Sequence, residues 1–174
     1  VGNGLTFEVG KFVTPIGTEP TESNLNNNYS RAWLYALGPY YHVGARVSYP
    51  VNSKVTLGGM IVNGWNATGD NNSGKSFGAS VTIVPSSKVT IIQNILAGPE
   101  QTDNTDDVRT YSDTNLAITA SAKTTAGFEI REASTDRPSA PIRDIAGRIA
   151  TRLRLKRPAV TDSDLIFVTA VKPG

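Results

Sequence analysis

The sequence predicts an all-β fold, namely an antiparallel up-and-down transmembrane β-barrel or part of one. A short turn recurs along the chain, with Lys54, Lys88 and Lys123 at intervals of 34 and 35 residues. Each interval contains two segments of alternating apolar and small polar residues, separated by a longer polar segment. Strand pairs joined alternately by a short turn and a long loop are typical of a membrane β-barrel. Only 18% of the residues are charged and glycine is abundant, which favours β-structure with many turns over a helical bundle.

The first half of the chain predicts four strands. Residues 5–13 form the first, because their apolar side chains occupy alternate positions. The segment 14–30 is rich in proline and asparagine and predicts a long loop. Residues 31–37 are apolar and aromatic and are followed by Gly-Pro, which predicts a second strand. Residues 41–51 and 54–65 alternate on either side of the first lysine turn and predict a hairpin.

The second half repeats this pattern twice. Residues 76–84 show the clearest alternation in the chain, and together with 88–97 they predict a hairpin around the second lysine turn. The acidic segment 98–113 is interpreted as a solvated loop, since the spacing of its carboxylates does not match a calcium-binding loop. Residues 115–120 and 124–130 predict the third hairpin. The barrel segment is expected to contain about seven strands, with short turns near residues 50–54, 85–88 and 121–123.

The charge balance changes near residue 131. Residues 1–130 carry 8 basic and 10 acidic side chains, whereas 131–174 carry 9 and 5. We divide the chain accordingly into a barrel segment, 1–131, and a basic tail, 132–174. The tail is expected to be disordered, or to contain at 148–156 a strand that presents arginines to a lumen or a basic amphipathic helix. It could equally be sequence read in a shifted frame.

Alternation is also typical of a soluble β-sandwich, because one face of each of its sheets is solvated. Such a binding module is the alternative interpretation, and it requires Val81 and Ile83 to be buried against a second sheet. The strict alternation of short turns with long loops favours the barrel. So does the position of large aromatic residues towards the predicted strand ends, where a membrane barrel has its interfacial girdles. These aromatic candidates are Phe12, Trp33, Tyr40, Tyr41, Tyr49 and Trp65.

One segment matches a nucleotide-binding pattern. Gly69 to Ser76 has the form G-x-x-x-x-G-K-S, but phosphate binding requires this loop to begin a helix. Residues 76–84 alternate instead, so we interpret the segment as a hairpin loop. His42 is the only histidine and has no second histidine, cysteine or acidic partner at ligand spacing. The sequence therefore predicts no enzyme, no catalytic residue, no metal and no cofactor, and the basic tail lacks the motifs of a nucleic-acid partner.

Four blocks resemble a known family. They are Gly-Lys-Phe-Val-Thr-Pro-Ile-Gly at 10–17, Asn-Tyr-Ser-Arg at 28–31, Tyr-Tyr-His-Val-Gly-Ala-Arg at 40–46 and Val-Asn-Gly-Trp-Asn at 62–66. In this order they resemble the OmpL-like outer-membrane β-barrel porins of the beta-barrel porin-2 family, over residues 5–131. The resemblance implies a barrel in the outer membrane of a Gram-negative bacterium, surrounded by lipid, through which small solutes or ions diffuse passively. Members of that family are considerably longer, so it implies that this chain supplies part of a barrel wall.

Under this interpretation, the side chains opposite each apolar stripe line the lumen. Charged residues within strands should point inward, because Arg or Lys on the lipid face near mid-membrane costs about 2–4 kcal/mol. Their charges would bias which solutes pass, the lysine turns would be periplasmic, and oligomerisation stays open. The other interpretation of these charges is the exposed face of a soluble sheet. The pore-lining candidates are Glu8, His42, Arg46, Ser48, Thr56, Ser76, Ser80, Thr82 and Glu129.

Overall fold

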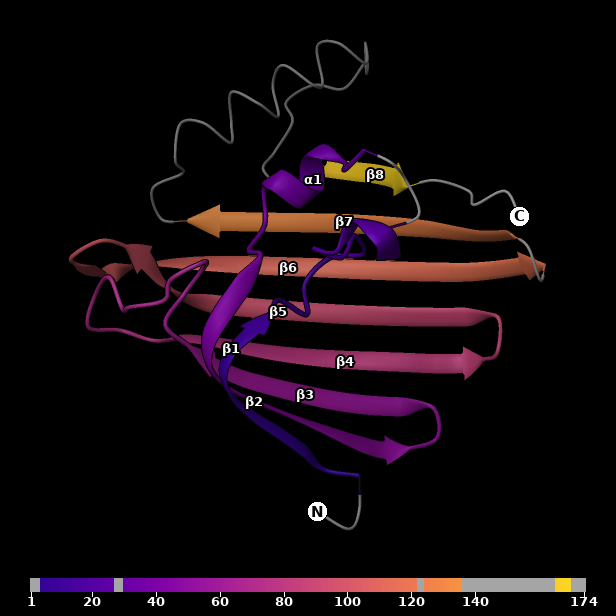
Figure 1. Ribbon diagram of the computed structural model, residues 1–174, viewed down its shortest axis with the longest axis horizontal. Coiled ribbons are helices and arrows are strands. Elements are labelled where there is room, and N and C mark those ends of the chain that lie inside the picture. Colours follow the sequence, from indigo (N-terminus) through magenta and orange to yellow (C-terminus); the bar gives the residue numbers. More distant parts are fainter. Residues whose placement is uncertain (1–3, 27–29, 122–123, 136–164, 170–174) are drawn as a thin grey trace.

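The strands form one antiparallel sheet in chain order, from β1 at one edge to β8 at the other (Figure 1). The structure is a computed structural model that describes residues 4–26, 30–121, 124–135 and 165–169. The strands are β1 (Thr6–Val13), β2 (Tyr41–Asn52), β3 (Val55–Val62), β4 (Ser76–Ser86), β5 (Val89–Gln101), β6 (Asn104–Ser121), β7 (Thr124–Thr135) and β8 (Leu165–Thr169). The predicted all-β, up-and-down antiparallel class is confirmed, and the sheet is open, as in a partial barrel.

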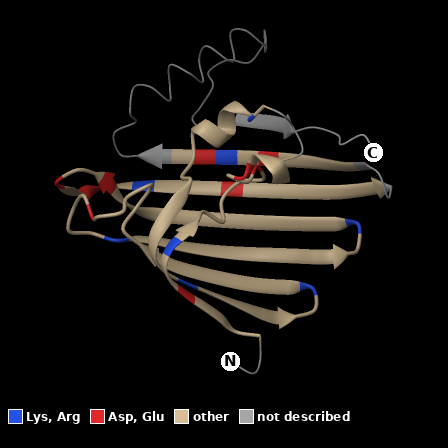
Figure 2. Cartoon of the chain, in the orientation of Figure 1, with Lys and Arg blue, Asp and Glu red and all other residues tan. Residues whose placement is uncertain are grey.

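The lysine turns join β2 to β3 and β4 to β5. In the first of them, Asn52 Oδ1 accepts the backbone N–H groups of Lys54 at 2.8 Å and of Val55 at 3.0 Å. This asparagine turn needs only two residues outside the ladder, which explains why the connection stays short. In the second, Ser86 Oγ accepts the N–H of Lys88 at 3.4 Å. Both turns lie at the same end of the strands, while the acidic β5–β6 hairpin lies at the other (Figure 2).

The predicted strand at 31–37 is wrong. This segment contains the helical turn α1 (Trp33–Ala36), inside the long connection 14–40 between β1 and β2, which also contains the 3-10 turn η1 (Ser23–Leu25). The physical reason is that β1 pairs directly with β2, from Thr6 opposite Ser48 to Val13 opposite Tyr41, so the ladder has no place for a strand between them. The segment 31–37 is apolar because its helical turn, and not a strand, buries Leu34, which is only 2% exposed.

The predicted acidic loop at 98–113 is also wrong. β5 continues to Gln101 and β6 begins at Asn104, so the two strands form a long hairpin with a two-residue turn. Asp103 adopts a positive φ of 57°, a conformation that aspartate tolerates better than most residues. Asn104 Oδ1 accepts the N–H groups of Asp106 at 2.9 Å and of Asp107 at 3.2 Å. Local side-chain bonds thus support a tight turn where the charge density indicated a loop.

The sandwich alternative is not supported by the described residues. These residues form a single sheet, and on it Val81 is half-buried and Ile83 is 36% exposed. In the tail, the backbone of β8 pairs with β7 from Leu165 opposite Arg131 to Thr169 opposite Gly127, whereas segment 148–156 lies outside the described residues. No helix among the described residues has the length and apolar character needed to span a bilayer.

Candidate functional site

The two faces of the sheet differ in polarity. One face, the outward face, exposes large apolar side chains such as Phe7 (65% exposed), Val9 (72%) and Phe77 (61%). The opposite face, here called the polar face, carries most of the buried polar and charged groups: His42, Ser76, Asn94, Asp113, Asn115, Glu129 and Arg131. Soluble proteins place these classes the other way round, whereas a membrane barrel is apolar outside and polar within.

The strand register places all nine predicted pore-lining residues on the polar face. Glu8 lies opposite Arg46, Thr56 opposite Thr82, and Glu129 opposite Asn115. Ser48 and Ser80 both lie opposite Gly58, on either side of it. His42 and Ser76 share this face through the same two-residue alternation. The nine residues are not equally accessible, however, because His42, Ser76 and Glu129 are buried beneath neighbouring groups.

A long segment lies across the polar face. This segment, whose described residues are 14–26 and 30–40, is here called the inward loop, and it passes in front of β5 and β6 towards β7 (Figure 1). Ile16 from the loop packs with Val62, Leu96 and Tyr111 in a small hydrophobic cluster on that face. The loop therefore occupies space that an open lumen would otherwise leave empty.

A buried carboxylate on β6 holds the start of the inward loop. Asp113, which is fully buried, accepts the backbone N–H of Gly17 at 3.1 Å through Oδ2. The same oxygen accepts the side-chain amides of Asn94 at 3.0 Å and Asn115 at 2.7 Å. The Asn94 amide also donates to the carbonyl of Pro15 at 3.3 Å. Because a buried carboxylate needs this many donors to offset its lost hydration, Asp113 is fixed tightly beneath the loop.

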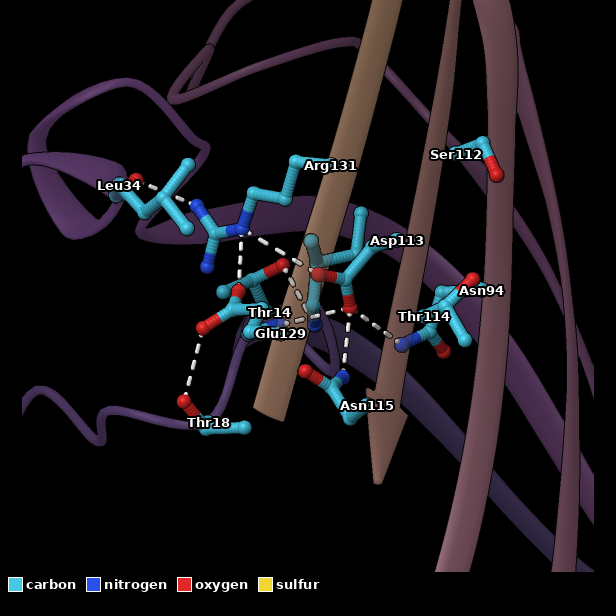
Figure 3. Close-up of polar contacts among 12 residues, drawn as sticks. Thr14, Thr18, Leu34, Asn94, Ser112, Asp113, Thr114, Asn115, Glu129 and Arg131 are labelled. Carbon is cyan, nitrogen blue, oxygen red and sulfur yellow. Dashed lines mark hydrogen bonds and ion pairs between the residues drawn. The ribbon is translucent and has the colours of Figure 1, made fainter. Parts of the chain in front are cut away.

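An ion pair on β7 holds both ends of the inward loop (Figure 3). Thr18 donates its hydroxyl to Glu129 Oε2 at 2.8 Å. Arg131 donates through Nε to Glu129 and, at 3.2 Å, to Asp113, and through Nη1 to the carbonyl of Leu34. We call Asp113, Glu129 and Arg131, which are at most 6% exposed, the latch.

Two glycines make room for the arginine of the latch. A Cβ atom at Gly17 would lie 2.2 Å from Arg131 Nη2, and one at Gly38 would lie 2.7 Å from Nη1. Gly17 also has a positive φ of 97°. The loop can therefore approach the guanidinium closely only because these two positions carry no side chain.

His42 is buried, and its ring links the segment that follows β1 to the segment that follows β3. Its Nε2 lies 3.1 Å from Thr14 Oγ1, and its Nδ1 lies 3.0 Å from the carbonyl oxygen of Gly64. Thr14 begins the inward loop and Gly64 follows β3. The structure thus gives His42 a positioning role in addition to its place on the polar face.

Glu8 and Arg46 form the exposed ion pair of the polar face. Arg46 Nε donates to Glu8, and the two side chains are 31% and 47% exposed, respectively. The guanidinium lies over the Phe12 ring at 4.7 Å and donates through Nη1 to the carbonyl of Val13 at 3.4 Å. In contrast to the latch, this pair is accessible to a solute.

The six aromatic candidates occupy three kinds of position. Tyr41 and Tyr49 share the outward face with Phe7, near strand ends, and Lys11 lies over the Tyr41 ring. The other four lie on the polar face or in the inward loop. Phe12 and Trp65 pack against the cluster on the polar face, and the Trp65 ring contacts Tyr111 edge-on at 4.9 Å. Trp33 and Tyr40 belong to the inward loop, outside the strands.

The segment that matches the nucleotide-binding pattern does not begin a helix, because β4 starts at Ser76. Ser76 donates its hydroxyl to Glu100 Oε1 at 2.7 Å, which joins this loop to β5. Lys75 pairs with Asp70 and, through this hydrogen bond, lowers the pKa of the Asp70 carboxyl. Lys75 and Ser76 thus make contacts that stabilise the β3–β4 loop itself.

Sequence reasoning missed Asn94, Asp113, Asn115 and Arg131. The sequence pattern places Asp113 in a loop and Arg131 at the boundary with the tail, whereas Glu129 is among the predicted residues. The available signal was the two-residue spacing of Asp113 with Asn115 and of Glu129 with Arg131, which places each pair on one face of a strand.

The comparisons with known proteins give one match. A family model described as "Putative beta-barrel porin-2, OmpL-like" matches residues 1–145. Searches of curated proteins and of solved structures returned no significant match.

Proposed function

The chain belongs to the OmpL-like beta-barrel porin-2 family, and from this premise we propose that it supplies part of the wall of an outer-membrane channel. Small solutes or ions would cross this channel by passive diffusion, with no catalytic step. The outward face would contact the lipid of a Gram-negative outer membrane, and the polar face would line the water-filled passage.

The observation that carries this proposal is the opposite polarity of the two faces. An exposed face bearing Phe7, Val9, Phe77 and Ile95 is unfavourable in water but suited to hydrocarbon. The same strands place ionisable and amide side chains on the other face, where a lumen would hydrate them.

The inward loop supports a further part of the proposal, namely that the passage is narrowed. The loop lies on the proposed lumen side and is attached to β5, β6 and β7 through Asn94, Asp113, Glu129 and Arg131. A segment held at several points narrows a passage more reproducibly than a free loop, because it cannot move aside with each passing solute.

Planar-bilayer recording tests the channel directly. Full-length protein inserted into a bilayer should give discrete conductance steps, and their absence under conditions of verified insertion would refute the proposal. In a salt gradient, Glu8→Gln should shift the reversal potential towards anion selectivity and Arg46→Gln towards cation selectivity, since each removes one exposed charge from the passage. Lys54→Gln, at a turn outside the strands, is the control and should produce a smaller shift.

A further inference from the structure

A hollow of about 200 Å³ lies on the polar face beside the inward loop, with Pro15 of the loop at its rim. Its polar lining comes from four strands, β1, β2, β4 and β5. The lining side chains that matter here are Glu8, Arg46, Ser48, Met60, Ser80 and Asn94.

The hollow exists because β3 has a glycine at its base. A Cβ atom at Gly58 would lie 2.2 Å from Ser80 Oγ, so any larger residue would displace that hydroxyl. The neighbouring position Gly78 is covered by the side chain of Met60, which gives the hollow one apolar surface. The space is on the order of seven water volumes, which suits a small solute.

The polar groups around the hollow are fixed in place, and some of their hydrogen-bonding capacity is left over. Arg46 is held by Glu8, by the ring of Phe12 and by the carbonyl of Val13, yet further N–H groups of its guanidinium have no partner among the described residues. Asn94 is 2% exposed and donates its amide to Asp113 and to the carbonyl of Pro15, so it is a fixed part of the wall of the hollow.

The charges around the hollow cancel. Glu8 and Arg46 form one ion pair, so the hollow favours neither a cation nor an anion by net charge. The groups that remain comprise donors on Arg46 and hydroxyls on Ser48 and Ser80 that both donate and accept. A neutral molecule with several hydroxyl groups and an apolar C–H face matches this combination best.

We infer that this hollow is a binding subsite for a neutral polyhydroxylated solute of monosaccharide size, beside the inward loop. The inference rests on the proposed function, because it names the solute class that the channel would favour. Weak binding at such a point raises the local solute concentration yet allows release, as diffusion through a selective passage requires.

Saturation-transfer NMR with glucose on the full-length protein in detergent tests the subsite without requiring conductance. Glucose signals should show saturation, and Ser80→Ala should weaken the apparent affinity about 2- to 10-fold, the effect of one lost hydrogen bond. Thr90→Val is the matched control, because Thr90 is on the neighbouring strand β5 and on the same face but outside the hollow, and it should leave the affinity unchanged.

The outcomes separate the two proposals. Glucose binding that depends on Ser80 supports the subsite, even if bilayers show no conductance and the channel proposal fails. Conductance steps without glucose saturation would overturn the subsite and leave the channel intact. Equal loss of affinity in Ser80→Ala and Thr90→Val would also overturn it, since the hollow would then not be the place of binding.

Discussion

Arg131 joins three parts of the chain through one guanidinium group. It contacts Asp113 on β6, Glu129 on its own strand and the carbonyl of Leu34 at the far end of the inward loop. Asp113 and Glu129 together bring two carboxyl groups into a nearly dry site, and the guanidinium of Arg131 contacts both. Losing one partner of a buried ionic group is costly because the remaining charges lose their compensation.

Arg131→Met should therefore destabilise the folded protein by about 3–5 kcal/mol. Urea unfolding of the refolded protein, followed by tryptophan fluorescence, measures this loss. Arg46→Met is the matched control, because it removes an arginine from an exposed ion pair worth at most about 1 kcal/mol. A loss for Arg131→Met no larger than that of Arg46→Met would contradict the role of the latch.

For single residues, the sequence predicts the face of the strand on which a side chain lies but not the groups that it contacts. It placed Glu8, Arg46 and Glu129 on one face, because period-two alternation determines the side of a strand. It could not indicate that Glu129 is covered while Glu8 is exposed. The group that covers Glu129 is Thr18, 111 residues away, and alternation carries no information about such a contact.

The attachment of the whole inward loop to the sheet depends on Gly17. A side chain there would adopt an unfavourable positive φ and also collide with Arg131. Both effects act on the attachment of the loop and not on the strands, which pair independently of it.

Gly17→Ala should release the inward loop while leaving the sheet folded. A positive φ costs an alanine about 1–2 kcal/mol, so the detached population should rise about 5- to 30-fold. Trypsin cleavage after Arg31, within the loop, reports this population by mass spectrometry. Gly69→Ala is the control, since a Cβ there meets open space and its φ is not positive, and its cleavage rate should stay at the wild-type value. Equal rates for both variants would show that Gly17 does not secure the loop.

Elements were predicted well wherever alternation and a turn signal coincided. The hairpins at the two lysine turns are of this kind, since Asn52 and Ser86 mark the turns and the flanking residues alternate. The prediction for 31–37 is wrong because a helical turn that buries one leucine has an amino-acid composition similar to that of a short strand. The prediction for 98–113 is wrong because its acidic residues indicate solvent exposure, which is typical of a β-hairpin tip as well as of a loop.

The whole sheet separates basic turns from acidic connections. Lys54 and Lys88 lie at one end of the strands, and Asp103, Asp106 and Asp107 lie at the other, near the β3–β4 loop (Figure 2). In an outer membrane the short turns are expected on the periplasmic side and the longer connections outside.

Cysteine labelling tests this orientation, and the sequence contains no cysteine that would interfere. Asp106→Cys, at the β5–β6 hairpin, should react with a membrane-impermeant maleimide on intact cells. Ser87→Cys, at the β4–β5 turn, is equally exposed on the protein surface but should react only after the outer membrane is permeabilised. The opposite pattern would show that the sheet is inserted the other way round.

The contacts of the inward loop also imply an order of assembly. The loop lies near the start of the chain, yet its anchors Asn94, Asp113, Glu129 and Arg131 lie 79 to 111 residues further on. Because distant contacts form only after the intervening chain has been ordered, β5, β6 and β7 must pair before the loop has anything to bind. In the proposed channel, the passage would thus be wide while the wall is being built, and the attachment of the loop would be complete only when β7 is in place.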